Sequence, residues 1–195
     1  MDVRIELRTI FKHQNNCTFL YKIFCTKVLD TLYINYCGSK ATKAAKTIKG
    51  NSTTSASFDE IEGKKINQKK NFRVTVYAYK MVNGKKEIIA KTIIAHLAGT
   101  KSVKYTNPKA LELTKSAYQI KVKKTAQIEA KVTLENSKKK LLPESHVAKL
   151  RYKSSNTKIA TVDKNGKITG KSKGNCFIYV YTVNGLMKKV KVTVK

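Results

Sequence analysis

The side chains that could do acid–base or nucleophilic chemistry are few and widely separated in this sequence. The three histidines, His13, His96 and His146, have no nucleophile close by in sequence, and the last two fall on predicted strands. Glu60 and Glu62 are two residues apart in a predicted loop. Paired-carboxylate catalysis instead needs two carboxyl groups on either side of a bound sugar. We therefore predict no catalytic residues, and packing or capping roles for His96 and His146.

The four cysteines are Cys17, Cys25, Cys37 and Cys176. They form no Cys-x-x-Cys pair, and no histidine lies at the spacing of a zinc ligand. Buried free thiols are the favoured interpretation. A disulfide among the first three and a catalytic thiol are the alternatives. No metal and no cofactor are predicted.

A short acidic segment at residues 163–166 has some features of a calcium loop. Asp163 and Asn165 supply two oxygen ligands, but this ligand count is too low and Lys164 lies between them. The segment instead predicts the end of a strand that runs into a hairpin. Turn positions, and no phosphate-binding loop, are predicted for Gly166, Gly170 and Gly174.

Charge is the most unusual property of the chain. The formal net charge is +29 over 195 residues, from 37 lysines and only four arginines. Arginine is the preferred reader of bases, whereas lysines give a diffuse positive field. The basic runs at residues 121–124, 138–140 and 188–191 could form one face that attracts an anionic polymer such as teichoic acid, or nucleic acid. The alternative is a solvated surface.

Aromatic side chains that might stack on bases lie on a predicted strand. Phe177, Tyr179 and Tyr181 occupy positions that a core would claim, which argues against a nucleic-acid partner.

The elements that must position these residues are strands. No apolar pattern of helical period follows residue 40, and short strands recur every 8–12 residues or so, as in a β-sandwich. Residues 153–169 read as strand, turn, strand, turn, strand. Asn-Gly pairs at 83–84, 165–166 and 184–185 predict tight hairpins with positive φ. Residues 1–30 predict one or two strands, with a short helix as the competitor.

These patterns predict an all-β fold of two tandem immunoglobulin-like β-sandwiches, the N-terminal one incomplete. Within the second sandwich, the apolar run at residues 176–183 predicts a central strand. The alternating lysines and valines at residues 188–195 predict an edge strand, where lysines discourage aggregation.

Residues 111–195 resemble a bacterial immunoglobulin-like domain of group 2. The basic insertion at residues 136–144 departs from the compact pattern of that family. The segments that carry the resemblance are Ser154-Ser155-Asn156, Ile159-Ala160-Thr161-Val162-Asp163, Gly166-Lys167-Ile168-Thr169-Gly170, Gly174, Ile178-Tyr179-Val180 and Val190-Lys191-Val192-Thr193-Val194.

Residues 31–98 are similar to the later strands of a fibronectin type III domain, although the tryptophan of that family is absent. We expect an irregular or truncated segment at 1–30 and a linker at 99–110. The segments that carry the similarity are Leu32-Tyr33-Ile34-Asn35-Tyr36, Phe72-Arg73-Val74-Thr75-Val76-Tyr77-Ala78-Tyr79 and Asn83-Gly84-Lys85.

The resemblance implies an extracellular or wall-associated bacterial module that acts as a spacer or in adhesion. Its expected partners are an anionic wall polymer or a host surface component, and neighbouring domains. Lys22 and Lys27 interrupt any signal-peptide pattern, so we expect a piece of a longer exported protein. The alternatives are a basic nucleic-acid-binding protein and the noncatalytic accessory region of a cell-wall hydrolase.

Overall fold

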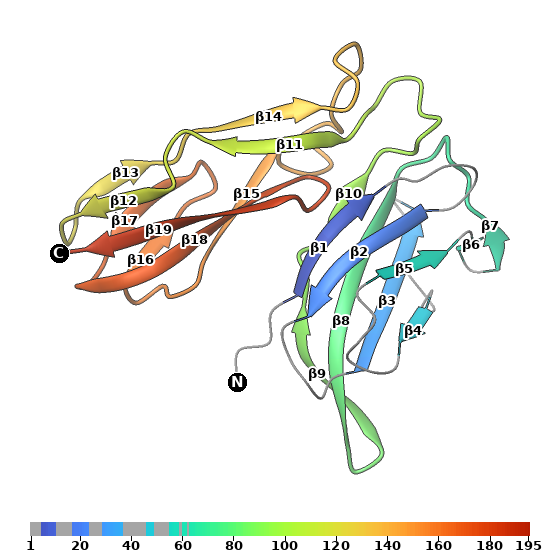
Figure 1. The fold of residues 1–195 in the computed structure, drawn as a ribbon, viewed down its shortest axis with the longest axis horizontal. Helices are drawn as coiled ribbons and strands as arrows, with labels where there is room; N and C mark the ends of the chain where they lie inside the picture. Colours follow the sequence, from blue (N-terminus) through green and yellow to red (C-terminus); the bar gives the residue numbers. More distant parts are fainter. Residues whose placement is uncertain are drawn as a thin grey trace. The chain divides into compact units, whose positions relative to one another are not determined.

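Strands are the regular elements of the described chain (Figure 1). The computed structural model describes residues 60–61 and 63–195 in full, together with the backbone of five earlier strands. These five are β1 (Ile5–Ile10), β2 (Cys17–Ile23), β3 (Leu29–Tyr36), β4 (Lys46–Ile48) and β5 (Ser55–Phe58). The predicted all-β class is confirmed. None of the described segments is a helix long and apolar enough to cross a membrane.

The chain forms two compact units, Met1–Thr106 and Asn107–Lys195. In the first, β3 pairs antiparallel with β8 (Phe72–Val82), and β4 lies on the far side of β3. The strands β1, β2 and β5 form a second sheet. The sequence predicts a polar loop at residues 60–70, but its first part holds a small hairpin of β6 (Glu60–Ile61) and β7 (Lys64–Lys65).

The other edge of β8 is covered by two strands in succession. β9 (Lys85–Lys91) pairs with its outer half and β10 (Ala95–Leu97) with its beginning. The sequence predicts one continuous partner over residues 87–95. The two strands are separated at Thr92, whose backbone N donates to the Val76 carbonyl at 2.9 Å. Its hydroxyl accepts from the Val76 N–H at 3.1 Å, so this one residue satisfies the buried backbone at the gap.

The segment predicted as a linker, residues 99–110, is divided between the two units. The Lys101 N–H donates to the Gln68 carbonyl at 3.0 Å, and the Thr100 hydroxyl lies 2.7 Å from Gln68 Oε1. A Cβ at Gly99 would collide with the carbonyl oxygens of Gln68 and Lys70. Residues 99–102 are therefore bound closely to the first unit, while Pro108 already begins a strand of the second.

The second unit is built from nine strands around one core. A four-stranded sheet has the order β12-β19-β18-β15, and two smaller groups, β11-β14 and β13-β17-β16, complete the unit. The bounds are β11 (Pro108–Leu113), β12 (Ala117–Ile120), β13 (Thr125–Gln127), β14 (Ala130–Leu134), β15 (Leu150–Ser154), β16 (Ala160–Val162), β17 (Lys167–Gly170), β18 (Gly174–Thr182) and β19 (Met187–Val194).

The alternating pattern of residues 126–134 predicts a single strand, but the segment changes partners halfway. β13 pairs with β17, whereas β14 pairs with β11. Between them, Ile128 is 3% exposed, and its N–H donates to the Gly166 carbonyl at 3.0 Å. The break lets one segment join both small groups while its apolar side chain stays in the core.

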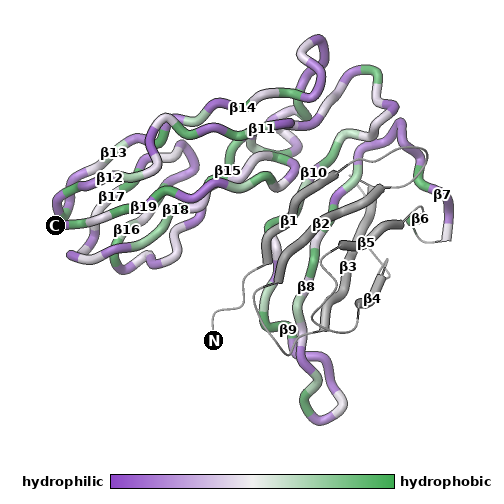
Figure 2. Tube along the Cα trace, in the orientation of Figure 1, coloured by the Kyte–Doolittle hydropathy of each residue, from purple (hydrophilic) through white to green (hydrophobic). Residues whose placement is uncertain are grey.

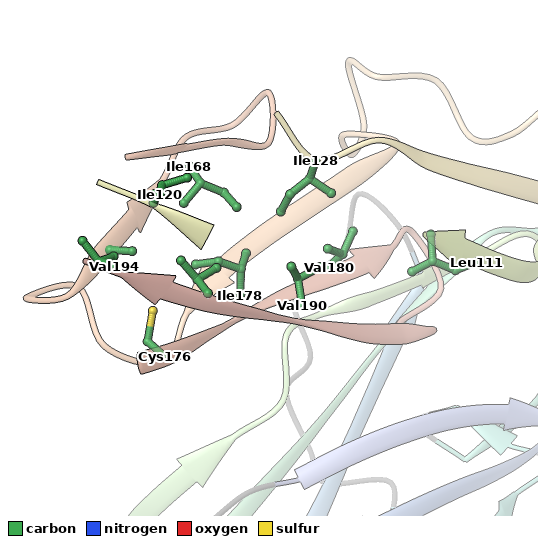
Figure 3. Packing of buried hydrophobic residues seen from close by; sticks show 11 residues of the cluster. Leu111, Ile120, Ile128, Ile168, Cys176, Ile178, Val180, Val190 and Val194 are labelled. Atoms are coloured by element: carbon green, nitrogen blue, oxygen red, sulfur yellow. The ribbon is translucent and has the colours of Figure 1, made fainter. Parts of the chain in front are cut away.

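The core follows from alternation along the strands, because successive side chains of a strand point to opposite faces. Val190, Val192 and Val194 of β19 are all buried, while Lys191 between them is exposed and Thr193 is half-buried. Side chains from the four-stranded sheet and from the two smaller groups of strands meet in this core (Figure 3). The loop that follows β14 is hydrophilic instead (Figure 2). The labelled core residues are Leu111, Ile120, Ile128, Ile168, Cys176, Ile178, Val180, Val190 and Val194.

The prediction that residues 188–195 form an edge strand is wrong. β19 lies inside the sheet, between antiparallel β18 and parallel β12. The parallel contact joins Ala117–Ile120 to residues 191–194, a pairing that local alternation does not reveal. The lysines of β19 consequently lie on a sheet face and do not guard an edge.

The three Asn-Gly pairs form two kinds of turn. Asn83 and Gly84 both have positive φ, 49° and 73°, as a two-residue type I′ hairpin requires. At 165–166 and 184–185 only the glycine has positive φ. There the predicted pair of positive φ values is wrong, because the Asn keeps an ordinary backbone conformation.

Lys123 offers a direct test of backbone strain in this unit. It has a φ of 64°, a left-handed conformation that costs a residue with a Cβ about 1–2 kcal/mol. Glycine removes this strain, but it also gives the unfolded chain more conformational entropy, which offsets part of the gain. We therefore expect Lys123→Gly to raise the free energy of unfolding by about 0.5–1 kcal/mol. Urea unfolding of the full chain measures this. Lys124→Gly, at ordinary φ, is the matched control and should lower stability; equal losses in both variants would contradict the account.

Candidate functional site

The histidines and carboxylates considered for catalysis are not gathered into a site in the described part of the chain. His96 lies in β10 between the buried residues Ala95 and Leu97. His146 is half-buried, and its backbone N–H donates to the Pro143 carbonyl at 2.9 Å. His13 and Glu62 lie outside the described residues. Among residues that are described, no three His, Cys, Asp or Glu side chains group as metal ligands would.

Cys176 is a buried free thiol, as predicted. It is 4% exposed in the core of the second unit. Burial raises the pKa of this thiol, and the contacts with Ser154 and Ala160 lower it by less. A thiol with a raised pKa is protonated at neutral pH and is a poor nucleophile. The side chains of Cys17, Cys25 and Cys37 lie outside the described residues.

The carboxylate of Asp163 accepts hydrogen bonds from backbone N–H groups of the turn that it begins. Asp163 Oδ1 accepts from the N–H of Asn165 at 2.8 Å and from the N–H of Lys167 at 2.9 Å. The bond from Lys167 is the main reason that the pKa of Asp163 is lowered, although the carboxyl group is fully exposed. This geometry is an Asx turn leading into a hairpin.

The glycines considered as phosphate-loop positions have separate structural roles. At Gly166 φ is 83°, and a Cβ there would lie 2.7 Å from the Tyr152 ring. Gly170 ends β17, where a Cβ would lie 2.9 Å from the Lys121 carbonyl. Gly170 is thus required by close packing of two strands, whereas the sequence predicts a turn.

The three basic runs do not form one face. Residues 121–124 lie in the turn that joins β12 to β13, and residues 138–140 follow β14. These two positions are separated by the length of β13 and β14, about 30 Å of extended chain. Only the third run belongs to the four-stranded sheet, where Lys189 and Lys191 are exposed in β19. That part of the prediction is wrong, and the charge is spread over the unit.

The aromatic residues of β18 point away from the core, contrary to the prediction. Cys176, Ile178 and Val180 are buried, so the alternating residues Phe177, Tyr179 and Tyr181 lie on the outer face of the sheet. Phe177 is 37% exposed and the two tyrosines are half-buried. The tyrosine rings are 6.4 Å apart between centroids and tilted by 42°.

Lysines from the neighbouring strands share this outer face. Tyr179 is paired with Lys189 of β19 on one side and with Lys153 of β15 on the other. Lys189 Nζ lies 5.0 Å from the centroid of the Phe177 ring, a cation–π distance. We call the set Lys153, Phe177, Tyr179, Tyr181, Lys189 and Lys191 the outer sheet face.

Arg151, on the same side of β15, has a structural role. One guanidinium nitrogen, Nη2, donates to the carbonyls of Thr182 at 2.8 Å and Val183 at 3.1 Å. Burial lowers the pKa of Arg151 to about 10, so the side chain remains charged at neutral pH. These bonds hold β15 against the turn that follows β18.

The strand order defines the class of the second unit. β11 pairs with β14, β13 pairs with β17, and β17 pairs with β16, while β12, β19, β18 and β15 form the opposite sheet. This is the arrangement of an immunoglobulin-like sandwich. Residues 109–194 match the family model of the bacterial Ig-like domain (group 2), in agreement with the predicted resemblance.

Three solved structures show distant similarity over the whole chain. The C-terminal 282-residue fragment of intimin, in complex with the intimin-binding domain of its translocated receptor, is 14% identical, with a TM-score of 0.31. The fibronectin(III)-like modules of Clostridium thermocellum CbhA are 10% identical, with a TM-score of 0.31. The S-layer protein rSbsC(31-844) is 11% identical, with a TM-score of 0.38.

Coverage differs among these structures. The alignments cover 100%, 98% and 99% of this chain, and 64%, 94% and 35% of the intimin, CbhA and S-layer chains respectively. The chain thus spans less than two thirds of the intimin fragment. No curated protein matches the chain. The family match supports a structural module of bacterial proteins, of a kind that is typically non-catalytic.

Asp163 predicts a specific dependence of stability on pH. Its pKa is lowered in the folded state, so its stabilising contribution is present above the ordinary value of 3.8 and is lost as the pH falls through the lower folded pKa. Asp163→Asn keeps an oxygen acceptor and removes the charge. Urea midpoints measured from about pH 6 to about pH 2 should fall less for the variant than for the unchanged protein. Parallel curves would contradict a charge-dependent turn.

Proposed function

We propose that this chain is a non-enzymatic structural or adhesion module of a bacterial surface or secreted protein. It would space or attach other domains at the cell wall, outside the cell. The observation that carries the proposal is a bacterial Ig-like domain whose exposed side chains are dominated by lysine, within a chain of net charge +29. Such a surface is attracted to polyanions over a distance set by ionic strength.

The placement of the titratable groups supports a non-enzymatic role. The thiol of Cys176 is buried and protonated, and the carboxylate of Asp163 accepts two backbone N–H groups of its own turn. Neither group faces a second catalytic partner in the described chain. The assignment of residues 31–98 as a fibronectin type III-like domain remains part of this proposal.

Binding to isolated cell walls tests the proposal. We expect the full chain to sediment with walls that carry anionic polymer, and the bound fraction to fall steeply as salt rises, because released counterions drive such binding. Walls from which the anionic polymer has been extracted are the control and should retain much less protein. Equal binding to both preparations would refute attraction by wall charge.

The nucleic-acid alternative is tested in the same assay with a 20-nucleotide oligothymidylate as competitor. The module proposal expects weak competition, similar to that of polyphosphate of equal charge. Release of the chain from walls by far less oligothymidylate than polyphosphate would favour the nucleic-acid alternative.

A further inference from the structure

The outer sheet face combines aromatic rings with positive charge and contains no acid. The strands β12, β15, β18 and β19 have the sequences AYQI, LRYKS, GNCFIYVYT and MKKVKVTV, without a single Asp or Glu. In contrast, β11 contains Glu112, and Asp163 lies beside β16. The lysines of this sheet are therefore not neutralised by carboxylates of their own strands.

The spacing of the lysines is set by the sheet. Lys153 and Lys189 are both paired with Tyr179, on the two strands that flank β18. Two strand spacings separate their backbones, which is about 10 Å. This is close to the length of one disaccharide unit in an extended polysaccharide. A polymer that crosses the strands, with one carboxylate on every second sugar, would therefore bring two successive carboxylates to Lys189 and Lys153.

The aromatic row is poorly suited to stacked bases. Bases need open, roughly parallel ring faces. One face of Phe177 lies under Lys189 Nζ, and the half-buried tyrosine rings are tilted by 42°. The guanidinium of Arg151, which would be suited to bidentate base recognition, bonds two backbone carbonyls. Lysine ammonium groups instead pair with anions as point charges, without a fixed geometry.

We propose that the outer sheet face binds a linear polysaccharide that carries one carboxylate per disaccharide. The polymer crosses the strands over Tyr179, with its sugar rings against Phe177 and Tyr179 and two successive carboxylates paired with Lys153 and Lys189. The inference rests on the proposed attraction to anionic polymers. It specifies which surface of the second unit binds and which class of polymer is bound.

Hyaluronan decasaccharide is a suitable probe, because it has one carboxylate per disaccharide. We measure its binding to the full chain by calorimetry, with polyphosphate and oligothymidylate of matched charge as comparison ligands. The full chain should bind hyaluronan more tightly than either comparison ligand. Phe177→Ser should weaken hyaluronan binding about 5- to 10-fold, in the range expected for one lost stacking contact, and leave polyphosphate binding unchanged.

The charge variant and the controls separate this face from the rest of the surface. Lys189→Ala should weaken hyaluronan binding and make its salt dependence shallower. Lys104 Nζ lies 5.3 Å from the Tyr105 ring centroid in the first unit, so Lys104→Ala and Tyr105→Ser are matched controls. Both controls should bind hyaluronan as the unchanged chain does. Phe177→Leu, which keeps apolar bulk without a ring, should weaken binding and so guards against loss of folding in Phe177→Ser.

Two results would overturn the inference. The first is equal binding of polyphosphate and hyaluronan that neither Phe177→Ser nor Phe177→Leu changes. This result would mean that the face binds anions through charge alone, without a contribution from the aromatic rings. The second is tighter binding of oligothymidylate that these variants weaken, which would make the face a nucleic-acid platform. If the chain still binds cell walls in a salt-dependent way in either case, the proposed function survives and only this inference fails.

Discussion

The alternation of side chains along β18 is the constraint on which the second unit depends. Cys176, Ile178 and Val180 of this strand occupy the core. The residues that alternate with them, Phe177 and Tyr179, therefore lie on the outer face of the sheet. The pairing of β18 with its two neighbours then brings lysines beside these rings. A slip of one residue would exchange the two faces entirely, so the core and the candidate site are fixed by the same register.

A buried polar network at the turn after β18 holds this register. The hydroxyl of Thr182 lies 2.6 Å from Asn184 Oδ1 and accepts from the Leu186 N–H at 3.0 Å. Asn184 Nδ2 donates to the Pro108 carbonyl at 2.9 Å, which ties the hairpin to the first strand of the unit. Thr182 and Asn184 are almost fully buried, so loss of either partner would leave polar groups unsatisfied. Asn184 is therefore needed for its amide as well as for a turn.

Local patterns predicted the elements of this unit well, and non-local pairing decided what they missed. The hairpin at residues 163–167 follows from Asp163 and Gly166, whose turn chemistry is encoded within five residues. The position of β19 was missed because its parallel partner β12 lies about 70 residues earlier in the chain. The break at Ile128 was missed for the same reason, since it depends on which strands flank each half.

The orientation of the aromatic residues shows where sequence patterns become ambiguous. In C-F-I-Y-V-Y-T-V both alternating sets are apolar, so hydrophobicity alone assigns neither to the core. The aliphatic set is buried, and the larger rings face outward, where lysine stems and ammonium groups cover part of them. Such a face retains apolar area at a surface that charge keeps hydrated. The outer face of this sheet is therefore cationic and partly aromatic.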